Sequence, residues 1–477
     1  MSEKNRAFSK DKRPFKNGNR PAHPAQPKPR PLFSAARMAA VEAVYAVLHN
    51  DAYASEAIDA QLRNAGLSQA DQRLCTGLVY KTLENLIAID FALSGFLKDA
   101  DALEEHVRDI LRISACQALF MDRIPENAIA DEAVRLTRAL KLEGLTGLVN
   151  GVVRNLLRGK NDIPWPKEDE RERYLSIRYS MPEWLVSRLI KAYGEETAKE
   201  IIMFRTQEHF MTVRPNMLKL TDEAFEKLLQ KKVWQTEKGI VPHAYHIREA
   251  SQIARDVDFR SGLFSIQGES SMLCAQIAHP VRASQVLDCC AAPGGKTAYM
   301  AEMMGGTGRI YAWDIHDHRV ALLKAMAQRL QLDNVRPAVH DACVLKDDMV
   351  GTMDLVLLDA PCSGLGVMDD KPDIKYRVSE KSISELTQIQ KKLLDTCCQY
   401  VKNGGTLVYS TCSILPDENV LQVEAFLKDH PEFEMDDMSA FMDARFAKHI
   451  GSFGLQLLES RDGVEGFFIA RMKRVRY

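Results

Sequence analysis

The feature that most constrains the fold is an alternation of short apolar runs and longer helical segments between residues 286 and 409. The short runs, which favour β-strands, are 286–287, 309–312, 335–339, 355–358 and 405–409. Segments typical of helices separate them, including 297–304, 317–331 and 381–401. Strands that alternate with helices form a mostly parallel sheet with right-handed crossovers. We therefore expect a Rossmann-like α/β domain in the C-terminal part of the chain.

Polar or reactive groups follow these strands, at the edge where a parallel sheet binds its ligands. The first strand continues as Cys290-Ala-Ala-Pro-Gly-Gly-Lys-Thr297, a turn whose glycines allow close approach of a ligand. Asp314 follows the second strand, and a carboxylate there can accept two hydrogen bonds from a ribose. Because no G-x-G-x-x-G opens the first helix, the pattern favours S-adenosylmethionine over a dinucleotide.

The next three strands also end in groups that can carry chemistry. Asp341 comes just after the third strand, Asp359 ends the fourth, and Cys412 follows the fifth. The fourth continues as Asp359-Ala-Pro-Cys-Ser-Gly364, which places a second cysteine, Cys362, at the same edge. Two cysteines at the ligand edge of a sheet favour a thiolate mechanism.

Methylation of cytosine at C5 is a reaction that needs such a thiolate. The ring carbon is too weak a nucleophile until a thiolate adds to C6 and makes C5 enamine-like. C5 then takes the methyl group, and a base removes the C5 proton to release the enzyme. One cysteine forms the adduct and the other helps to dissolve it. Spacing leaves open which cysteine attacks, because methylation of DNA cytosine uses a Pro-Cys nucleophile, which corresponds to Cys362.

The rest of the chain divides into three further units. Residues 1–31, rich in Lys, Arg, Pro and Asn, predict a disordered basic tail, either a solubilising leader or an arm for RNA phosphates. Residues 32–163 have helical periodicity throughout, and a Pro- and charge-rich stretch ends this bundle. Residues 170–260 predict a small α+β linker module, and residues 261–477 form the methyltransferase domain.

Composition limits the partners and the compartment. The formal net charge is −2, so contact with nucleic acid has to come from local basic surface. The 10 cysteines lack C-x-x-C spacing, which predicts reduced thiols and no metal. No apolar stretch has the length of a membrane span or the position of a signal peptide. We expect a cytoplasmic protein without membrane contact.

The helical region resembles a known RNA-binding fold. Segments 71–80, 124–133 and 150–158 are similar to NusB-type domains, which implies that arginine-bearing helix faces contact RNA. Arg154 and Arg158 lie on one such face, at i and i+4. In the C-terminal part, Lys375 and Arg377 flank Tyr376 within segment 371–381. That segment is either an RNA grip, with cations on phosphates and a ring on a base, or an ordinary polar loop.

The motifs around Cys290, Cys362 and Cys412 resemble those of the RNA cytosine-C5 methyltransferases, the NOL1/NOP2/Sun family. The resemblance implies that Cys412 is the nucleophile and Cys362 assists product release, while Lys296 and Asp359 hold the cytosine. It also implies a site for S-adenosylmethionine in which Asp314 takes the ribose, Asp341 the adenine side, and Asp359 borders the reacting centre. The methionine part is held by Cys290, Ala291, Ala292, Pro293, Gly294, Gly295 and Lys296.

With a NusB-like domain in front, the chain resembles the bacterial members of this family that act on 16S rRNA. The expected substrate is 16S rRNA or a small-subunit assembly intermediate, and the expected enzyme is a monomer. Two alternatives remain open at this point. One is a DNA cytosine-C5 methyltransferase that uses Cys362, and the other is a non-catalytic RNA-binding factor for ribosome assembly.

Overall fold

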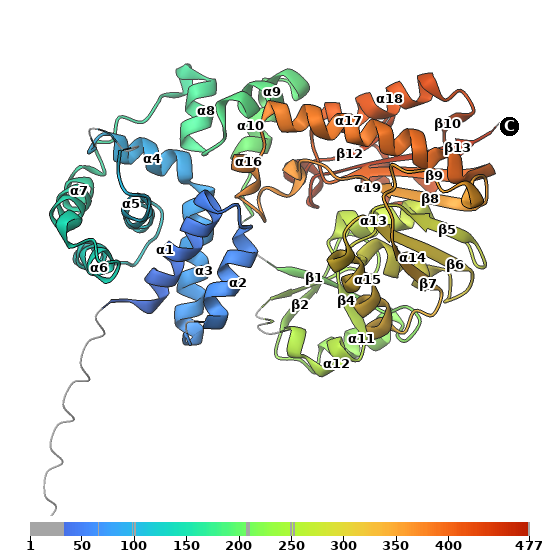
Figure 1. Ribbon diagram of the computed structural model, residues 1–477, viewed down its shortest axis with the longest axis horizontal. Helices are drawn as coiled ribbons and strands as arrows, with labels where there is room; N and C mark the ends of the chain where they lie inside the picture. Colours follow the sequence, from blue (N-terminus) through green and yellow to red (C-terminus); the bar gives the residue numbers. More distant parts are fainter. Residues whose placement is uncertain are drawn as a thin grey trace, which may run out of the picture.

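A computed structural model describes residues 33–475, except 65, 98, 100, 101, 207–209, 249, 251 and 252. The tail expected at residues 1–31 lies outside the described residues. Figure 1 shows the helices α1–α7 on the left and the large sheet on the right, with α8–α10 above and the β1–β4 sheet below the centre. In the part that is described, no helix has the length and apolar character needed to cross a membrane.

The N-terminal unit is a helical bundle, as the periodicity of residues 32–163 predicts. Its helices are α1 (Ala35–His49), α2 (Ala54–Asn64), α3 (Gln69–Glu84), α4 (Leu86–Ser94), α5 (Glu105–Leu119), α6 (Glu126–Ala139) and α7 (Thr146–Gly159). The serines Ser34 and Ser68 cap α1 and α3 by accepting hydrogen bonds from backbone N–H groups of the first turn. Helix α5 lies at the centre, since Ile110, Leu111 and Ile113 are fully buried in the shared core.

A connecting unit joins the bundle to the large sheet. It comprises α8 (Glu172–Arg178), α9 (Glu183–Tyr193), α10 (Glu195–Met203), β1 (Met211–Pro215), α11 (Asp222–Leu229), β2 (Gln235–Lys238), β3 (Tyr245–Arg248), α12 (Val257–Arg260) and β4 (Phe264–Ile266). The strands form an antiparallel sheet in the order β2-β3-β1-β4. Arg214 of β1 is fully buried and pairs with Glu302 at 2.6 Å, which docks this sheet on the next domain. The α+β linker module is confirmed.

The C-terminal unit is a mixed sheet of nine strands with helices on both faces. Its elements are α13 (Glu269–Ala278), β5 (Gln285–Asp288), α14 (Gly295–Met303), β6 (Arg309–Asp314), α15 (Asp317–Leu330), β7 (Val335–Val339), β8 (Met353–Asp359), α16 (Ile374–Arg377), α17 (Glu380–Cys397), β9 (Val401–Thr411), α18 (Val420–Asp429), β10 (Phe433–Met435), α19 (Ala444–Ala447), β11 (Ile450–Gly451), β12 (Gly454–Leu457), α20 (Glu459–Asp462) and β13 (Phe467–Arg474). The strand order is β11-β12-β13-β9-β8-β5-β6-β7, with β10 paired to β13.

The parallel part of this sheet runs from β7 to β9, and the remaining strands extend it in antiparallel pairs. Alternate residues of the strands face opposite helix layers, as strand geometry requires. Val286 packs with α13, α14 and α15, whereas the next residue, Leu287, packs with α17 and α18. The strand ends that carry the predicted site residues therefore lie at one edge, between these layers.

Candidate active site

The loop after β5 turns at a glycine, Gly294, where any side chain would be strained. Gly294 has a φ of +110°, a backbone conformation that side chains disfavour. A Cβ atom there would lie 2.5 Å from Met326 and 2.9 Å from Leu323, both on α15. The chain therefore turns tightly against α15 before α14 begins at Gly295.

A cavity of about 350 Å³ lies against this loop. Its walls include the predicted loop residues Cys290, Ala291, Ala292, Pro293, Gly295 and Lys296, together with Asp288 and Asp359. Gly294 faces α15 instead. Ile266, Gln267, Gly268 and Ser271 close the opposite side, and Lys371 lies at the same cavity.

Neither Asp314 nor Asp341 is among the residues that line this cavity. Asp314 is buried at the end of β6, where it accepts a hydrogen bond from the His316 N–H (3.0 Å) and pairs with Arg319 at 3.3 Å. Arg319 also donates to the carbonyl oxygen of Ala292 (2.8 Å), which links Asp314 to the loop. Asp341 accepts a hydrogen bond from the Cys343 N–H (2.9 Å). Contacts of either aspartate with a cofactor stay predictions.

The two motif cysteines meet, although they are 50 residues apart in the chain. Their Sγ atoms lie 3.2 Å apart. The hydrogen bond from Cys362 lowers the pKa of Cys412, and the positive charges of Lys296 and Lys371 lower that pKa further, against burial and Asp359. The same hydrogen bond, burial and the negative charge of Glu418 raise the pKa of Cys362. The pair therefore favours the thiolate at Cys412 and the thiol at Cys362.

Lys296 and Asp359 form an ion pair beside these cysteines. The Nζ atom of Lys296 lies 2.7 Å from Oδ2 of Asp359 and 4.9 Å from the centre of the Phe467 ring. The hydroxyl of Ser410 donates to the other carboxylate oxygen at 2.8 Å. Burial is the largest single influence and lowers the pKa of Lys296, but the charge and hydrogen bond of Asp359, together with the nearby Cys274 and Cys412, raise that pKa overall. A permanent cation and a paired carboxylate thus lie at the cavity wall.

Comparisons with known proteins agree with this geometry. Residues 275–473 match the family model described as 16S rRNA methyltransferase RsmB/F. Residues 34–158 match the NusB family, and residues 181–254 match the RsmF/B-like ferredoxin-like domain. A probable ribosomal RNA small subunit methyltransferase B of Bacillus subtilis is 34% identical over 439 residues, which cover 91% of this chain and 98% of the relative.

The chain belongs to the RsmB family of 16S rRNA methyltransferases. The ribosomal RNA small subunit methyltransferase B of Shewanella oneidensis is 30% identical over 91% of this chain and 98% of that protein. The crystal structure of PH0851 superposes with a TM-score of 0.79 at 25% identity and covers 92% of this chain and 98% of that one. The expected NusB-like bundle, α+β module and methyltransferase domain are confirmed, and the chain is an S-adenosylmethionine-dependent rRNA methyltransferase.

The cavity fits the methyl donor that this family uses. Asp288 lies in its wall, and burial raises the pKa of this carboxyl to about 7. One carboxylate oxygen accepts from the Thr297 hydroxyl (2.6 Å), whereas Oδ1 is buried and has no hydrogen-bond partner among the described residues. An unsatisfied buried oxygen of this kind suits the ammonium group of S-adenosylmethionine. Sequence reasoning did not select Asp288, although an acid at the end of an apolar strand was a usable signal.

Glu418, which sequence reasoning also missed, joins the two cysteine loops. This buried carboxylate accepts hydrogen bonds from the Ser363 N–H (2.8 Å), the Ser363 hydroxyl (2.6 Å) and the Ser413 hydroxyl (2.5 Å). The side-chain amide of Gln390 donates a fourth, at 3.1 Å. Ser363 and Ser413 each follow a motif cysteine, so one carboxylate holds both loops in register. Its position between distant segments carries no local sequence signal.

Lys375, Tyr376 and Arg377 are not the RNA grip that the composition of segment 371–381 allowed. Lys375 is only 3% exposed, and the hydroxyl of Tyr376 donates to the carbonyl oxygen of Ser180 (3.2 Å). Arg377 donates to the carbonyl oxygen of Ala52 (2.6 Å), on the helical bundle. These polar groups already have partners in the helical bundle and in the connecting unit, so they are not available to RNA. By contrast, Arg154 and Arg158 on α7 are exposed, and their contact with RNA stays a prediction.

Proposed function

We propose that this enzyme methylates C5 of a cytidine in 16S rRNA through a covalent bond between Cys412 and C6 of the base. The observation that carries the proposal is the cysteine pair, with its Sγ atoms 3.2 Å apart. Hydrogen bonding and lysine charge favour the thiolate at Cys412, as an attacking nucleophile requires. The Pro-Cys residue, Cys362, has the opposite bias.

The chain's own groups account for each step of the reaction. The Cys412 thiolate bonds to C6, the electron pair of the C5–C6 double bond shifts to C4–C5, and that of the C4–N3 double bond moves to N3, which leaves C5 enamine-like. Lys296 and Asp359 hold the polar edge of the cytosine, because an ammonium donates and a carboxylate accepts hydrogen bonds. When bound, S-adenosylmethionine supplies an electrophilic methyl group for C5. Cys362 then assists release, in which C5 loses its proton and the bond between C6 and sulfur breaks.

The loop from Cys290 to Lys296 holds the methionine part of the donor in this proposal, with Asp288 on its ammonium group. Asp314 takes the ribose hydroxyls, and Asp341 lies on the adenine side. A loop cytidine is the suitable target, because the base has to leave its stack to enter the cavity. The substrate is 16S rRNA or a small-subunit assembly intermediate, and the enzyme acts in the cytoplasm as a monomer.

The proposal is tested by methylating 16S rRNA in vitro with labelled S-adenosylmethionine and mapping the product by bisulfite sequencing. We expect one cytidine to become resistant to bisulfite, and DNA of the same sequence to remain unmodified. Label on a base other than cytosine, or on the DNA alone, would contradict the proposal.

Asp314→Ala is expected to weaken binding of S-adenosylmethionine. Loss of the hydrogen bonds that the ribose hydroxyls donate to this charged carboxylate costs about 2 kcal/mol, or roughly 30-fold in Kd. Isothermal titration calorimetry measures this change. The matched control is Asp317→Ala, an exposed acid three residues further along, which should leave the Kd unchanged. Equal affinities for the wild type and Asp314→Ala would remove Asp314 from the proposed site.

A further inference from the structure

One cation at the catalytic cavity has been given no role beyond its electrostatic effect on Cys412. Lys371 is exposed, and it lines the cavity together with Lys296 and Asp359. Lys296 is neutralised by its ion pair with Asp359. The side chain of Lys371 has no hydrogen bond or ion pair with any residue that the structure describes. Lys371 is therefore the available positive charge at this cavity.

The loop that carries Lys371 is held from both sides. On one side, Asp369 accepts a hydrogen bond from the Thr206 N–H (2.9 Å), in the connecting unit. On the other side, the buried carboxylate of Asp373 accepts from the Ala54 N–H at 3.3 Å, at the start of α2 in the NusB-like domain. Asp373 also pairs with Arg377 at 3.5 Å. Residues on either side of Lys371 are thus fixed by two other domains.

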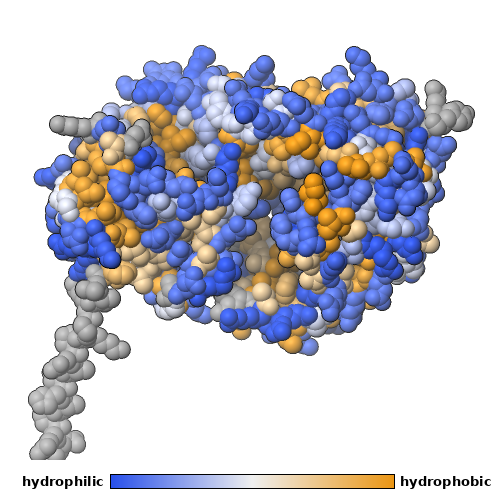
Figure 2. All heavy atoms as spheres, viewed as in Figure 1, coloured by the Kyte–Doolittle hydropathy of each residue, from blue (hydrophilic) through white to orange (hydrophobic). Residues whose placement is uncertain are grey.

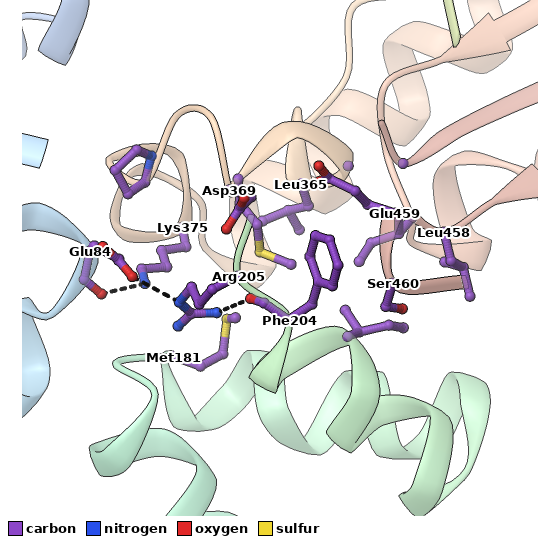
Figure 3. A pocket seen from close by; sticks show the side chains of 16 residues that line it. Glu84, Met181, Phe204, Arg205, Leu365, Asp369, Lys375, Leu458, Glu459 and Ser460 are labelled. Carbon is purple, nitrogen blue, oxygen red and sulfur yellow. Dashed lines mark hydrogen bonds and ion pairs between the residues drawn. The ribbon is translucent and has the colours of Figure 1, made fainter. Parts of the chain in front are cut away.

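Helix α16, which follows this loop, docks directly on the NusB-like domain. Lys375 donates to the carbonyl oxygen of Glu84 (3.0 Å), the last residue of α3. The guanidinium of Arg377 lies 4.5 Å from the centre of the Tyr53 ring. Figure 3 shows Lys375 and Arg205 pointing toward Glu84, where the three domains meet. Burial lowers the pKa of Lys375 to about 7, because the contact with α3 removes water from the ammonium group.

The surface next to this junction is open. Figure 2 shows a hollow between the helical bundle and the methyltransferase domain. Cavities of about 700 Å³ and about 740 Å³ lie on either side of the Asp369–Pro372 loop, one against α3 and one against β1 and β4. The loop therefore separates two open surfaces next to the catalytic cavity.

We propose that Lys371 binds a backbone phosphate beside the target cytidine and that the NusB-like domain positions Lys371 through Asp373 and α16. The inference rests on the proposed function, since it takes RNA as the substrate. A base leaves its stack only if the backbone on its flank is held, and phosphate contacts set that register. Lys371 is a substrate-binding residue here, whereas Asp373 and Arg377 are positioning residues.

The first test compares RNA binding by Lys371→Ala with that of the wild type over a range of salt concentrations. Loss of one phosphate contact on a single strand should weaken binding about 5-fold at 0.1 M salt and reduce the salt slope by about 0.7. Lys371→Arg should restore both values. Lys381→Ala is the matched control, because Lys381 is 86% exposed on α17 and pairs only with Glu385 among the described residues. An unchanged affinity and salt slope for Lys371→Ala would overturn the proposal.

The second test addresses positioning. Asp373→Ala removes a negative charge, which by charge alone should tighten RNA binding. If Asp373 positions Lys371, the variant should instead weaken binding about 5-fold and lose the same salt slope. The double variant with Lys371→Ala should be no weaker than Lys371→Ala alone, whereas additive losses would overturn the positioning role. If Asp373→Ala does not fold, Tyr53→Ala provides a second variant. It removes a neutral, 53% exposed ring that packs against Arg377, and it should reduce the salt slope as Asp373→Ala does.

These measurements separate the inference from the proposed function. The affinity and the salt slope are read from binding of 16S rRNA, without turnover. A wild-type enzyme that binds this RNA but leaves its cytidines unmethylated would contradict the proposed function, while the comparison with Lys371→Ala would still decide the role of Lys371.

Discussion

Cys412→Ala should abolish methylation of 16S rRNA, and Cys362→Ala should leave the enzyme covalently joined to the RNA. The first variant lacks the sulfur that attacks C6, and loss of a covalent nucleophile lowers turnover on the order of 10⁴-fold or more. The second variant retains this sulfur but lacks the thiol 3.2 Å away that assists release. Denaturing gels detect the adduct as a shifted band, and mass spectrometry of the RNA-linked peptide locates it.

The results with the two variants also decide which cysteine attacks C6 and which one assists release. Cys75→Ala, a substitution in the core of the helical bundle, is the control and should neither trap RNA nor lose turnover. An adduct in Cys412→Ala but not in Cys362→Ala would reverse the two roles. Removal of the Cys362 thiol also removes the hydrogen bond that lowers the pKa of Cys412, so the adduct should form more slowly at pH 7 in Cys362→Ala than in the wild type.

Glu418→Ala should destabilise the methyltransferase domain more than any other single change discussed for it. The substitution removes, in a buried site, the acceptor of the Ser363 N–H and of the Ser363 and Ser413 hydroxyls, and one of the two hydrogen bonds of the Gln390 amide. Unsatisfied buried donors and lost hydrogen bonds to a charged group together cost at least about 3 kcal/mol. Thermal unfolding should show a fall on the order of 10 °C for this domain.

The same substitution should reduce turnover of the protein that remains folded. Glu418 holds both cysteine loops, and misplacement of reacting groups by about 1 Å costs roughly 100-fold in rate. The control is Glu424→Ala, an exposed acid on α18 that should change neither stability nor rate. A Glu418→Ala protein with wild-type stability and rate would show that the loops keep their geometry without this carboxylate.

The order of elements and the place of the chemistry could be predicted because both depend on local signals. A strand shows its apolar run within a few residues, and a parallel sheet always brings the carboxyl ends of its strands to one edge. For this reason Lys296, Asp359, Cys362 and Cys412 could be expected to lie together from the amino-acid sequence alone. The sequence predicted a mostly parallel sheet, and the antiparallel extension by β10–β13 became apparent only in the fold.

Partners that are far apart in the chain could not be predicted in this way. A lysine-rich, polar segment looks solvent-exposed in the sequence, yet Lys375 is buried because α16 packs on a domain that ends more than 200 residues earlier. Glu418 lies among ordinary polar residues, and three of its four donors come from two distant segments, at Ser363 and Gln390. Such contacts depend on how domains pack, which local periodicity does not encode.

The fold class, the motifs and the residues that can carry the reaction follow from the amino-acid sequence, because strand ends and motif spacing are local properties. The bias between Cys412 and Cys362 follows only from the folded structure, because it depends on the charges of Lys296, Lys371 and Glu418 around one hydrogen bond. Electrostatic interactions depend on distance through space, and that distance exists only once the domains are packed.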